Sequence, residues 1–247
     1  MEAIYAFCRA MDDIVDTEGI SAQTAQRQLD EWRRELKAME QGFASHPITV
    51  ALAEVQHRFN IPTAHFETMI DGMEMDLTHR RYESFEELRR YCERVASSVG
   101  WMSIKMFGCR HPASQRYATA LGIALQLTNI LRDIKTDAAA ARIYLPQEDL
   151  KRFGVSEQEI LESRMTPALK QLLAFEAARA KDYFKQAADA CHESGEGRQL
   201  LPAQIMNKIY RQLLCKIEQS DYAVFGSRIS VPKPEQIGIA LRCLAGL

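Results

Sequence analysis

The sequence predicts an all-α fold. Apolar residues recur at helical spacing along nearly all of the 247 residues, and strand-like alternation is almost absent. The breaks in this pattern near residues 108–112 and 195–197 are too short to link separate domains. We therefore predict one helical domain over residues 1–247.

The periodic segments and their start signals define the predicted helices in order. They cover residues 1–17, 21–42, 47–59, 62–79, 85–108, 113–137, 157–163, 167–192, 198–220 and 234–245. Three starts carry a capping residue with a matching partner: Ser84 with Glu87, Ser156 with Glu159, and Thr166 with Pro167. Such residues satisfy the unpaired N–H groups of a first helical turn, which fixes where these helices begin.

Composition excludes several classes of protein. A hydrophobic content of 47% and a charged content of 26% are typical of a globular protein with a substantial core. The net charge of −2 and the absence of a basic cluster argue against a nucleic-acid partner. No apolar run is long enough to span a bilayer and no signal peptide is recognisable, so we predict a cytoplasmic protein. Peripheral contact with a membrane and the oligomeric state stay open.

Cysteine and histidine spacing gives no metal or disulfide signal. The six cysteines contain no CxxC pair and lie in apolar segments, which predicts buried thiols. The six histidines are dispersed along the chain without ligand spacing. Neither residue type is nominated for a site.

Two aspartate pairs are the most informative feature. Asp12 with Asp16 and Asp133 with Asp137 are each four residues apart, and the pairs are about 120 residues apart. Residues at this spacing stand one above the other on a helix, so two ionised carboxylates repel unless a cation lies between them. Mg²⁺ binds carboxylate oxygens and completes its coordination with water and substrate phosphates. The pattern favours a magnesium and diphosphate site.

Further polar residues share the face of each pair. At about 100° per residue, two stripes arise. They contain Tyr5, Arg9, Asp12 and Asp16 in the first helix, and Gln126, Asn129, Asp133 and Asp137 in the later one. Asp13 points away from the first stripe. Because the other faces are apolar, these stripes are expected to line a cavity or contact a partner.

The alternative is a pair of solvated or salt-bridged helix faces. Under it, Asp133 would pair with Arg132 or Lys135, but neither is three or four residues away, so we expect no such pair. Asp71, Glu74 and Asp76 form a further acidic group. Acidic residues on a half-exposed helix are usually solvated, and these are weaker candidates for a cavity wall.

Several segments together resemble the squalene and phytoene synthase family of head-to-head prenyl transferases. The segments are YAFCRAMDDIVDT, YCERVASSVG, LGIALQLTNILRDIKTD and RIYLPQEDLKRFGVS. The resemblance covers nearly the whole chain. GMEMDLTHRRYESFEELRRYCERVASSVG and YAVFGSRISVPKPEQIGIALRCL look most like bacterial presqualene diphosphate synthases of squalene and hopanoid biosynthesis.

The resemblance implies an all-α terpenoid-synthase-like bundle around a central cavity that binds two farnesyl diphosphates and several Mg²⁺ ions. The metal ligands that it implies are Asp12, Asp16, Asn129, Asp133 and Asp137. Substrate contacts are implied for Arg9, Gln126, Asn129, Arg142, Tyr144 and Arg228, the last with Tyr210 and Tyr222 in a segment that closes the pocket. Tyr91 matches a cavity tyrosine near the reacting carbons, so the implied catalytic set is Tyr91 with the four motif aspartates. Candidates for the apolar lining are Val95, Val99, Leu127 and Ile123, which are equally plausible as core.

The implied reaction is Mg²⁺-dependent condensation of two farnesyl diphosphates to presqualene diphosphate. Three alternatives stay open. They are phytoene synthesis from geranylgeranyl diphosphate, continuation to squalene with NADPH, and a non-catalytic lipid-binding or assembly relative. The absence of a Gly-rich dinucleotide motif weighs slightly against NADPH, and intact aspartate motifs weigh against the non-catalytic relative.

The chain departs from the family pattern at its start. Family members usually carry an upstream helix, whereas only eleven residues precede Asp12 here. Either the sequence is a fragment, its start was assigned at an internal methionine, or one wall of the pocket is absent. The family helix is therefore expected to be missing from this chain.

Overall fold

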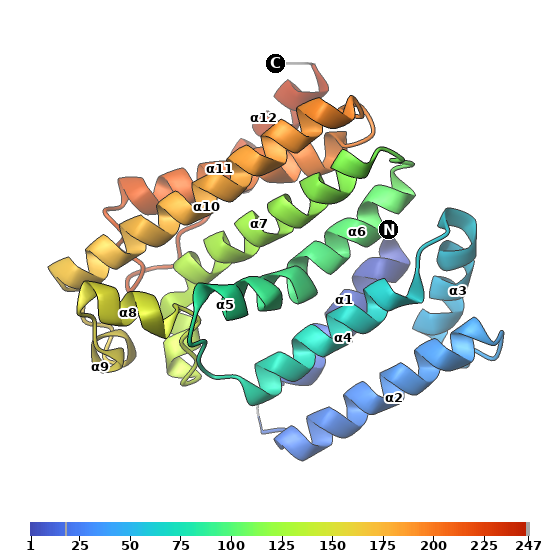
Figure 1. Ribbon diagram of the computed structural model, residues 1–247, viewed down its shortest axis with the longest axis horizontal. Helices are drawn as coiled ribbons and strands as arrows, with labels where there is room; N and C mark the ends of the chain where they lie inside the picture. The colour runs from blue at the N-terminus through green and yellow to red at the C-terminus, as the bar shows by residue number, and fades with distance from the viewer. Residues whose placement is uncertain (18, 246–247) are drawn as a thin grey trace.

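The computed structural model describes residues 1–17 and 19–245, which form helices and no strand (Figure 1). The helices of the N-terminal half are α1 (Glu2–Asp16), α2 (Ala22–Glu40), α3 (Pro47–Phe59), α4 (Thr63–Thr78), α5 (Phe85–Cys92), the π-helical segment η1 (Glu93–Ser97) and α6 (Ser98–Met106). Those that follow are α7 (Pro112–Ala139), α8 (Gln147–Phe153), α9 (Glu157–Leu161), α10 (Pro167–Ser194), α11 (Leu201–Gln219) and α12 (Lys233–Leu244). The all-α prediction is confirmed.

The predicted boundaries agree closely with the observed ones, with two exceptions. Helix α8 was not predicted, although Pro146 precedes its first turn, which carries Glu148 and Asp149, and Gly154 ends it in the left-handed conformation. At seven residues it is too short for periodicity to reveal. The predicted helix 85–108 is interrupted by η1. The sequence did not reveal this interruption, because a single π-helical turn leaves the apolar pattern largely intact.

The predicted caps are present, one of them in a reduced form. Ser156 and Glu159 make the full capping box at α9, and Thr166 accepts the N–H of Leu169 at the start of α10. Ser84 caps α5 through the N–H of Glu87. The Glu87 carboxylate instead accepts the N–H of Glu83, so the reciprocal half of that box is displaced by one residue.

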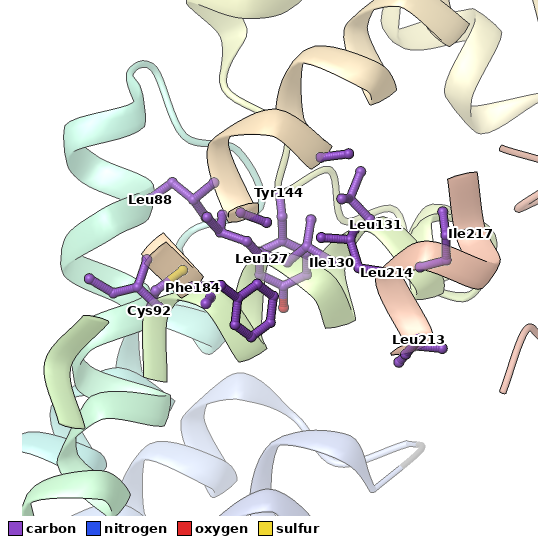
Figure 2. Packing of buried hydrophobic residues seen from close by; sticks show 14 of the residues in the cluster. Leu88, Cys92, Leu127, Ile130, Leu131, Tyr144, Phe184, Leu213, Leu214 and Ile217 are labelled. Atoms are coloured by element: carbon purple, nitrogen blue, oxygen red, sulfur yellow. The ribbon is translucent and has the colours of Figure 1, made fainter. Parts of the chain in front are cut away.

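Helix α7 is central to the packing. It lies against α10 along much of its length and also contacts η1, α6, α11 and α9 (Figure 1). Two clusters of buried hydrophobic residues result. The larger joins α5, α7, α10 and α11 (Figure 2), and the smaller joins α1, α2 and α4. The polar stripes of α1 and α7 therefore belong to helices whose other faces are packed.

Three charged residues lie in the packing of α8 against α10. The Arg179 guanidinium contacts both the Asp149 carboxylate, at 2.9 Å, and the Glu176 carboxylate, at 2.6 Å, and it stacks on the rings of Phe85 and Phe175. One cation thus faces two buried carboxylates. Burial first, and the nearby Asp149 as well, raise the pKa of Glu176 to about 7.

This raised pKa predicts a stability that depends on pH. Below about pH 4.5 Glu176 is protonated in both folded and unfolded chains, and its stabilising contribution is fully present. As the pH rises towards 7 the unfolded chain ionises first and that contribution is lost. At pH 8 we therefore expect the free energy of unfolding of Glu176→Gln to exceed that of the parent by on the order of 2 kcal/mol, which raises its urea midpoint. At pH 4.5 the two proteins should differ little.

Urea titrations across this pH range test the prediction. Glu54→Gln is the matched control, because Glu54 is exposed on α3 and makes no hydrogen bond or ion pair within the described residues. Equal pH profiles for the parent and Glu176→Gln would contradict it.

Candidate active site

One cavity of about 600 Å³ lies between the N-terminal helices and α7. Its walls come from α1, α4, α5, η1, α6 and α7, from the loop after α7, and from the loop before α12. The apolar part includes Met69, Met73, Val95 and Val99. The polar part includes five aspartates and three arginines: Asp12, Asp16, Asp76, Asp133, Asp137, Arg132, Arg142 and Arg228. The cavity is therefore apolar at one wall and strongly charged at another.

The first aspartate pair is where the sequence predicted it. Asp12 and Asp16 both line the cavity from α1, and Asp13 does not. Burial first, and the neighbouring Asp16 next, raise the pKa of Asp12 to about 6. A bound cation would remove this repulsion.

The second pair faces the same space from α7. Asp133, Asp137, Gln126 and Asn129 all line the cavity, as their shared stripe predicted. Burial, and after it Asp133, raise the pKa of Asp137 to about 7, with a further contribution from Asp16 on α1. Folding thus brings the two motifs within electrostatic reach of each other.

Arg142 connects the two motifs. It follows α7 in the chain, and its guanidinium lies 3.7 Å from the Asp16 carboxylate and 3.4 Å from the Val15 carbonyl oxygen. Arg142 and Tyr144, both predicted to contact the substrate, line the cavity. A cation placed here can contact a substrate phosphate that lies between the motifs.

The expectation that Asp133 has no arginine partner is wrong. Arg132 donates two hydrogen bonds to its carboxylate, and Arg228 donates two more at 3.0 and 3.2 Å. The i,i+4 rule describes Cβ directions, whereas a long arginine side chain can fold back onto its neighbour in sequence. Burial opposes ionisation of Asp133, but these hydrogen bonds lower its pKa on balance. Both arginines line the cavity, so Arg132 is a site residue that the spacing argument missed.

Arg9 is positioned differently from the prediction. Its guanidinium lies 2.8 Å from the exposed Asp13 carboxylate, and it is not among the residues that line the cavity. An i,i+4 partner on the adjacent face of α1 captures the side chain. Arg9 remains close enough to lower the pKa of Asp12, against the larger effect of burial.

Asp76 is the second residue that the sequence underrated. Asp71 and Glu74 pair with Arg33 on α2, as expected for a half-exposed helix, whereas Asp76 is buried and lines the cavity. Its carboxylate accepts the Tyr91 hydroxyl at 2.8 Å and the Tyr144 hydroxyl at 2.7 Å. A signal was present, because Asp76 continues the apolar line of Met69 and Met73 at helical spacing.

The remaining candidates divide between the cavity and the core. Val95 and Val99 line the cavity, whereas Leu127 (Figure 2) is buried in the larger core cluster. Ile123 belongs to the same cluster. Tyr222 also belongs to that cluster, and Tyr210 packs against it near Arg132. Of the predicted closing segment, only Arg228 reaches the cavity.

The donor set fits magnesium in part. Hard oxygen ligands face the cavity from both motifs, and Asn129 Oδ1 is buried without a hydrogen-bond partner in the part of the chain that the structure describes. However, no three His, Cys, Asp or Glu side chains within residues 1–17 and 19–245 already form a metal cage. These residues therefore suit an ion held by one or two carboxylates and completed by substrate oxygens.

The six cysteines are unpaired thiols, of which Cys92 and Cys109 are buried. Across the part of the chain that the structure describes, no helix has the length and hydropathy needed to cross a bilayer.

The all-α fold and the two aspartate motifs on one cavity can be compared with known proteins of the same family. The family described as squalene/phytoene synthase matches residues 1–235. A 15-cis-phytoene synthase from Synechococcus elongatus is 40% identical over 243 residues, covering 93% of this chain and 78% of that protein. Phytoene synthase 3 from Zea mays is 39% identical, covering 95% of this chain and 56% of its own length.

Solved structures give the same assignment. Squalene synthase HpnC from Alicyclobacillus acidocaldarius superposes with a TM-score of 0.81 at 30% identity, covering 89% of this chain and 82% of that one. A dehydrosqualene synthase in complex with ligand gives a TM-score of 0.85 at 28% identity, covering 99% and 84%. The chain belongs to the squalene/phytoene synthase family of prenyl transferases.

Proposed function

We propose that this chain joins two prenyl diphosphates head to head, with geranylgeranyl diphosphate as the preferred substrate and phytoene as the product. The observation that carries the proposal is the pair of aspartate motifs that face each other across a cavity with an apolar wall. The preference for the longer substrate rests on the phytoene synthases at 40% and 39% identity. Farnesyl diphosphate, the leading expectation from the sequence, is kept as the alternative because a squalene synthase and a dehydrosqualene synthase share the fold.

The chemistry explains why the cavity needs two different walls. Cleavage of an allylic C–O bond leaves a carbocation and a diphosphate that carries several negative charges. Arg132, Arg142 and Arg228 can bind the diphosphate as that charge develops. Mg²⁺ bound at Asp12, Asp16, Asn129, Asp133 and Asp137 would add further stabilisation of the leaving group.

The apolar wall serves the carbocation. A double bond of the second prenyl chain must attack before water does, so the cavity has to exclude water and align both chains. Met69, Met73, Val95 and Val99 are suited to this because their apolar side chains carry no N–H or O–H group and do not bind water. No covalent intermediate with a side chain is required.

A product assay tests the proposal. The chain, and a version extended through any upstream coding sequence, are incubated with geranylgeranyl or farnesyl diphosphate and Mg²⁺, with and without NADPH, and the lipids are analysed by mass spectrometry. Phytoene, or its cyclopropyl diphosphate precursor, as the main product would support the proposal. Presqualene diphosphate would move the chain to the farnesyl alternative, and squalene formed only with NADPH would move it to the reductive branch. Absence of any condensed product from both forms would favour the non-catalytic relative.

A further inference from the structure

The cavity wall contains a buried group that the aspartate motifs do not explain. Asp76 on α4 is 8% exposed, Tyr91 on α5 is 3% exposed, and Tyr144 in the loop after α7 is 8% exposed. All three line the cavity. The rings of Tyr91 and Tyr144 stack with their centroids 5.3 Å apart at 25°.

The hydrogen bonds within this group have a fixed direction. An ionised carboxylate only accepts, so each tyrosine hydroxyl must donate to Asp76, one to each oxygen. Burial raises the pKa of both tyrosines, which keeps their protons in place. Burial also raises the pKa of Asp76, while the two hydroxyl donors and Arg142 oppose that shift.

This arrangement determines which end of each hydroxyl dipole can meet a substrate. Because both protons point at Asp76, neither is available to a group in the cavity, and the free lone pairs of the hydroxyl oxygens are what remain. These lone pairs are the negative ends of the hydroxyl dipoles. A wall of this polarity attracts positive charge and offers no proton to it.

We propose that Asp76 is a positioning residue that orients the Tyr91 and Tyr144 hydroxyls so that this wall stabilises the prenyl carbocation. The inference rests on the proposed function. In this proposal the aspartate motifs bind the diphosphate, and Asp76 with Tyr91 and Tyr144 stabilises the cation. Preorganised dipoles of this kind act without rearranging during the reaction.

Asp76→Asn is the informative variant because it keeps the shape and changes the hydrogen-bond pattern. The asparagine oxygen can accept one tyrosine hydroxyl, but its NH₂ group can only donate, so the other tyrosine must turn its proton away. We expect kcat to fall about 10- to 100-fold, while KM for the prenyl diphosphate changes less than about threefold. Thermal stability should be unchanged or higher, since the substitution removes a buried charge.

Two sets of variants complete the design. Tyr91→Phe and Tyr144→Phe should each lower kcat. When either is combined with Asp76→Asn, the further loss of kcat should be smaller than the loss that the tyrosine substitution causes alone, because the three groups act as a unit. Tyr82→Phe is the matched control. The Tyr82 ring packs against both tyrosine rings, but its hydroxyl has no hydrogen-bond partner among the described residues and Tyr82 does not line the cavity.

A binding measurement tests the same idea without turnover. A prenyl dimethylammonium analogue and its neutral carbon isostere are titrated against parent and variants with Mg²⁺ and inorganic diphosphate. Asp76→Asn should weaken the ammonium analogue about tenfold and leave the isostere unaffected. Tyr82→Phe should change neither.

The outcomes separate the two hypotheses. If the parent forms no condensed product but the ammonium selectivity depends on Asp76, the proposed function fails, while the cation-attracting polarity that Asp76 gives to this wall is supported. If product forms and Asp76→Asn retains both the parent kcat and the ammonium selectivity, the inference is overturned. The inference is also overturned if Asp76→Asn lowers kcat but weakens binding of the isostere as much as binding of the ammonium analogue. A marked fall in melting temperature would have the same meaning, since either result would give Asp76 a merely structural role.

Discussion

Asp12→Asn and Asp137→Asn are each expected to lower turnover about 10²- to 10³-fold and to abolish the Mg²⁺ dependence of substrate binding. Asparagine preserves the shape of the side chain but not its charge. Asp12 and Asp137 belong to opposite motifs, so the two variants test both walls of the diphosphate site separately.

Loss of fold would not explain this result. Burial and the neighbouring carboxylates already raise the pKa of Asp12 to about 6 and that of Asp137 to about 7. The ionised form of each is therefore electrostatically unfavourable in the metal-free protein. Removing either charge should leave the melting temperature equal or higher. The expected signature is therefore an inactive protein that is no less stable than the parent.

The matched control lies one residue away from the site. Asp13→Asn changes the same residue type in α1, but Asp13 faces Arg9 at the surface and does not line the cavity. The measurements are product formation and titration with a non-reactive prenyl thiodiphosphate in Mg²⁺ and in EDTA. If Asp12→Asn and Asp137→Asn bind the analogue as tightly as Asp13→Asn does, the assignment of the motifs is wrong.

Gly122→Ala is expected to be the most destabilising small substitution in the chain. A Cβ at Gly122 on α7 would lie 2.6 Å from both Cα and N of Ser97 in η1, and 2.7 Å from its hydroxyl oxygen. These are backbone atoms of a segment that is held from the other side, where a Cβ on Gly72 of α4 would lie 2.7 Å from Val95. Neither Ser97 nor Val95 can move without disturbing the cavity wall, because both belong to η1 and Val95 lines the cavity.

We expect Gly122→Ala to destabilise the fold by about 3 kcal/mol and to lower the melting temperature by about 6 to 12 °C. Activity should fall with it, because Gln126 and Asn129 lie one and two turns further along α7. Calorimetry and urea unfolding give the measurement.

Gly238→Ala provides the comparison for this effect. It makes the same chemical change within helix α12, where the nearest atom to a new Cβ is Arg242 Nη1 at 3.9 Å. Alanine is the better helix former, so this variant should be neutral or stabilised by up to about 1 kcal/mol. Similar melting temperatures for the two variants would show that α7 and η1 can separate easily, against the packing described above.

Local patterns in the sequence determined most of the helices. Pro47–Phe59 was predicted to the residue. Helix α7 differs from its prediction by one residue at its start and two at its end, and α10 differs by two residues at its end alone. Caps, prolines at first positions and apolar periodicity act within a few residues of the chain, so they can be read without knowing the fold. The same reasoning placed Asp12, Asp16, Asp133 and Asp137 on two polar stripes that do line one cavity.

Only the tertiary structure decided which partner each polar side chain meets. Asp76 looks like its neighbour Asp71 in the sequence, yet it is buried because Tyr144, 68 residues away, donates to it. Arg9 shares the stripe of Asp12 but turns to Asp13, and Arg132 lies off the stripe of Asp133 but folds back onto it. Helical spacing determines the direction in which a side chain leaves the backbone. The partner of a long or buried polar side chain depends on which charges and hydroxyls other helices bring within about 3 Å, and those distances exist only once the chain has folded.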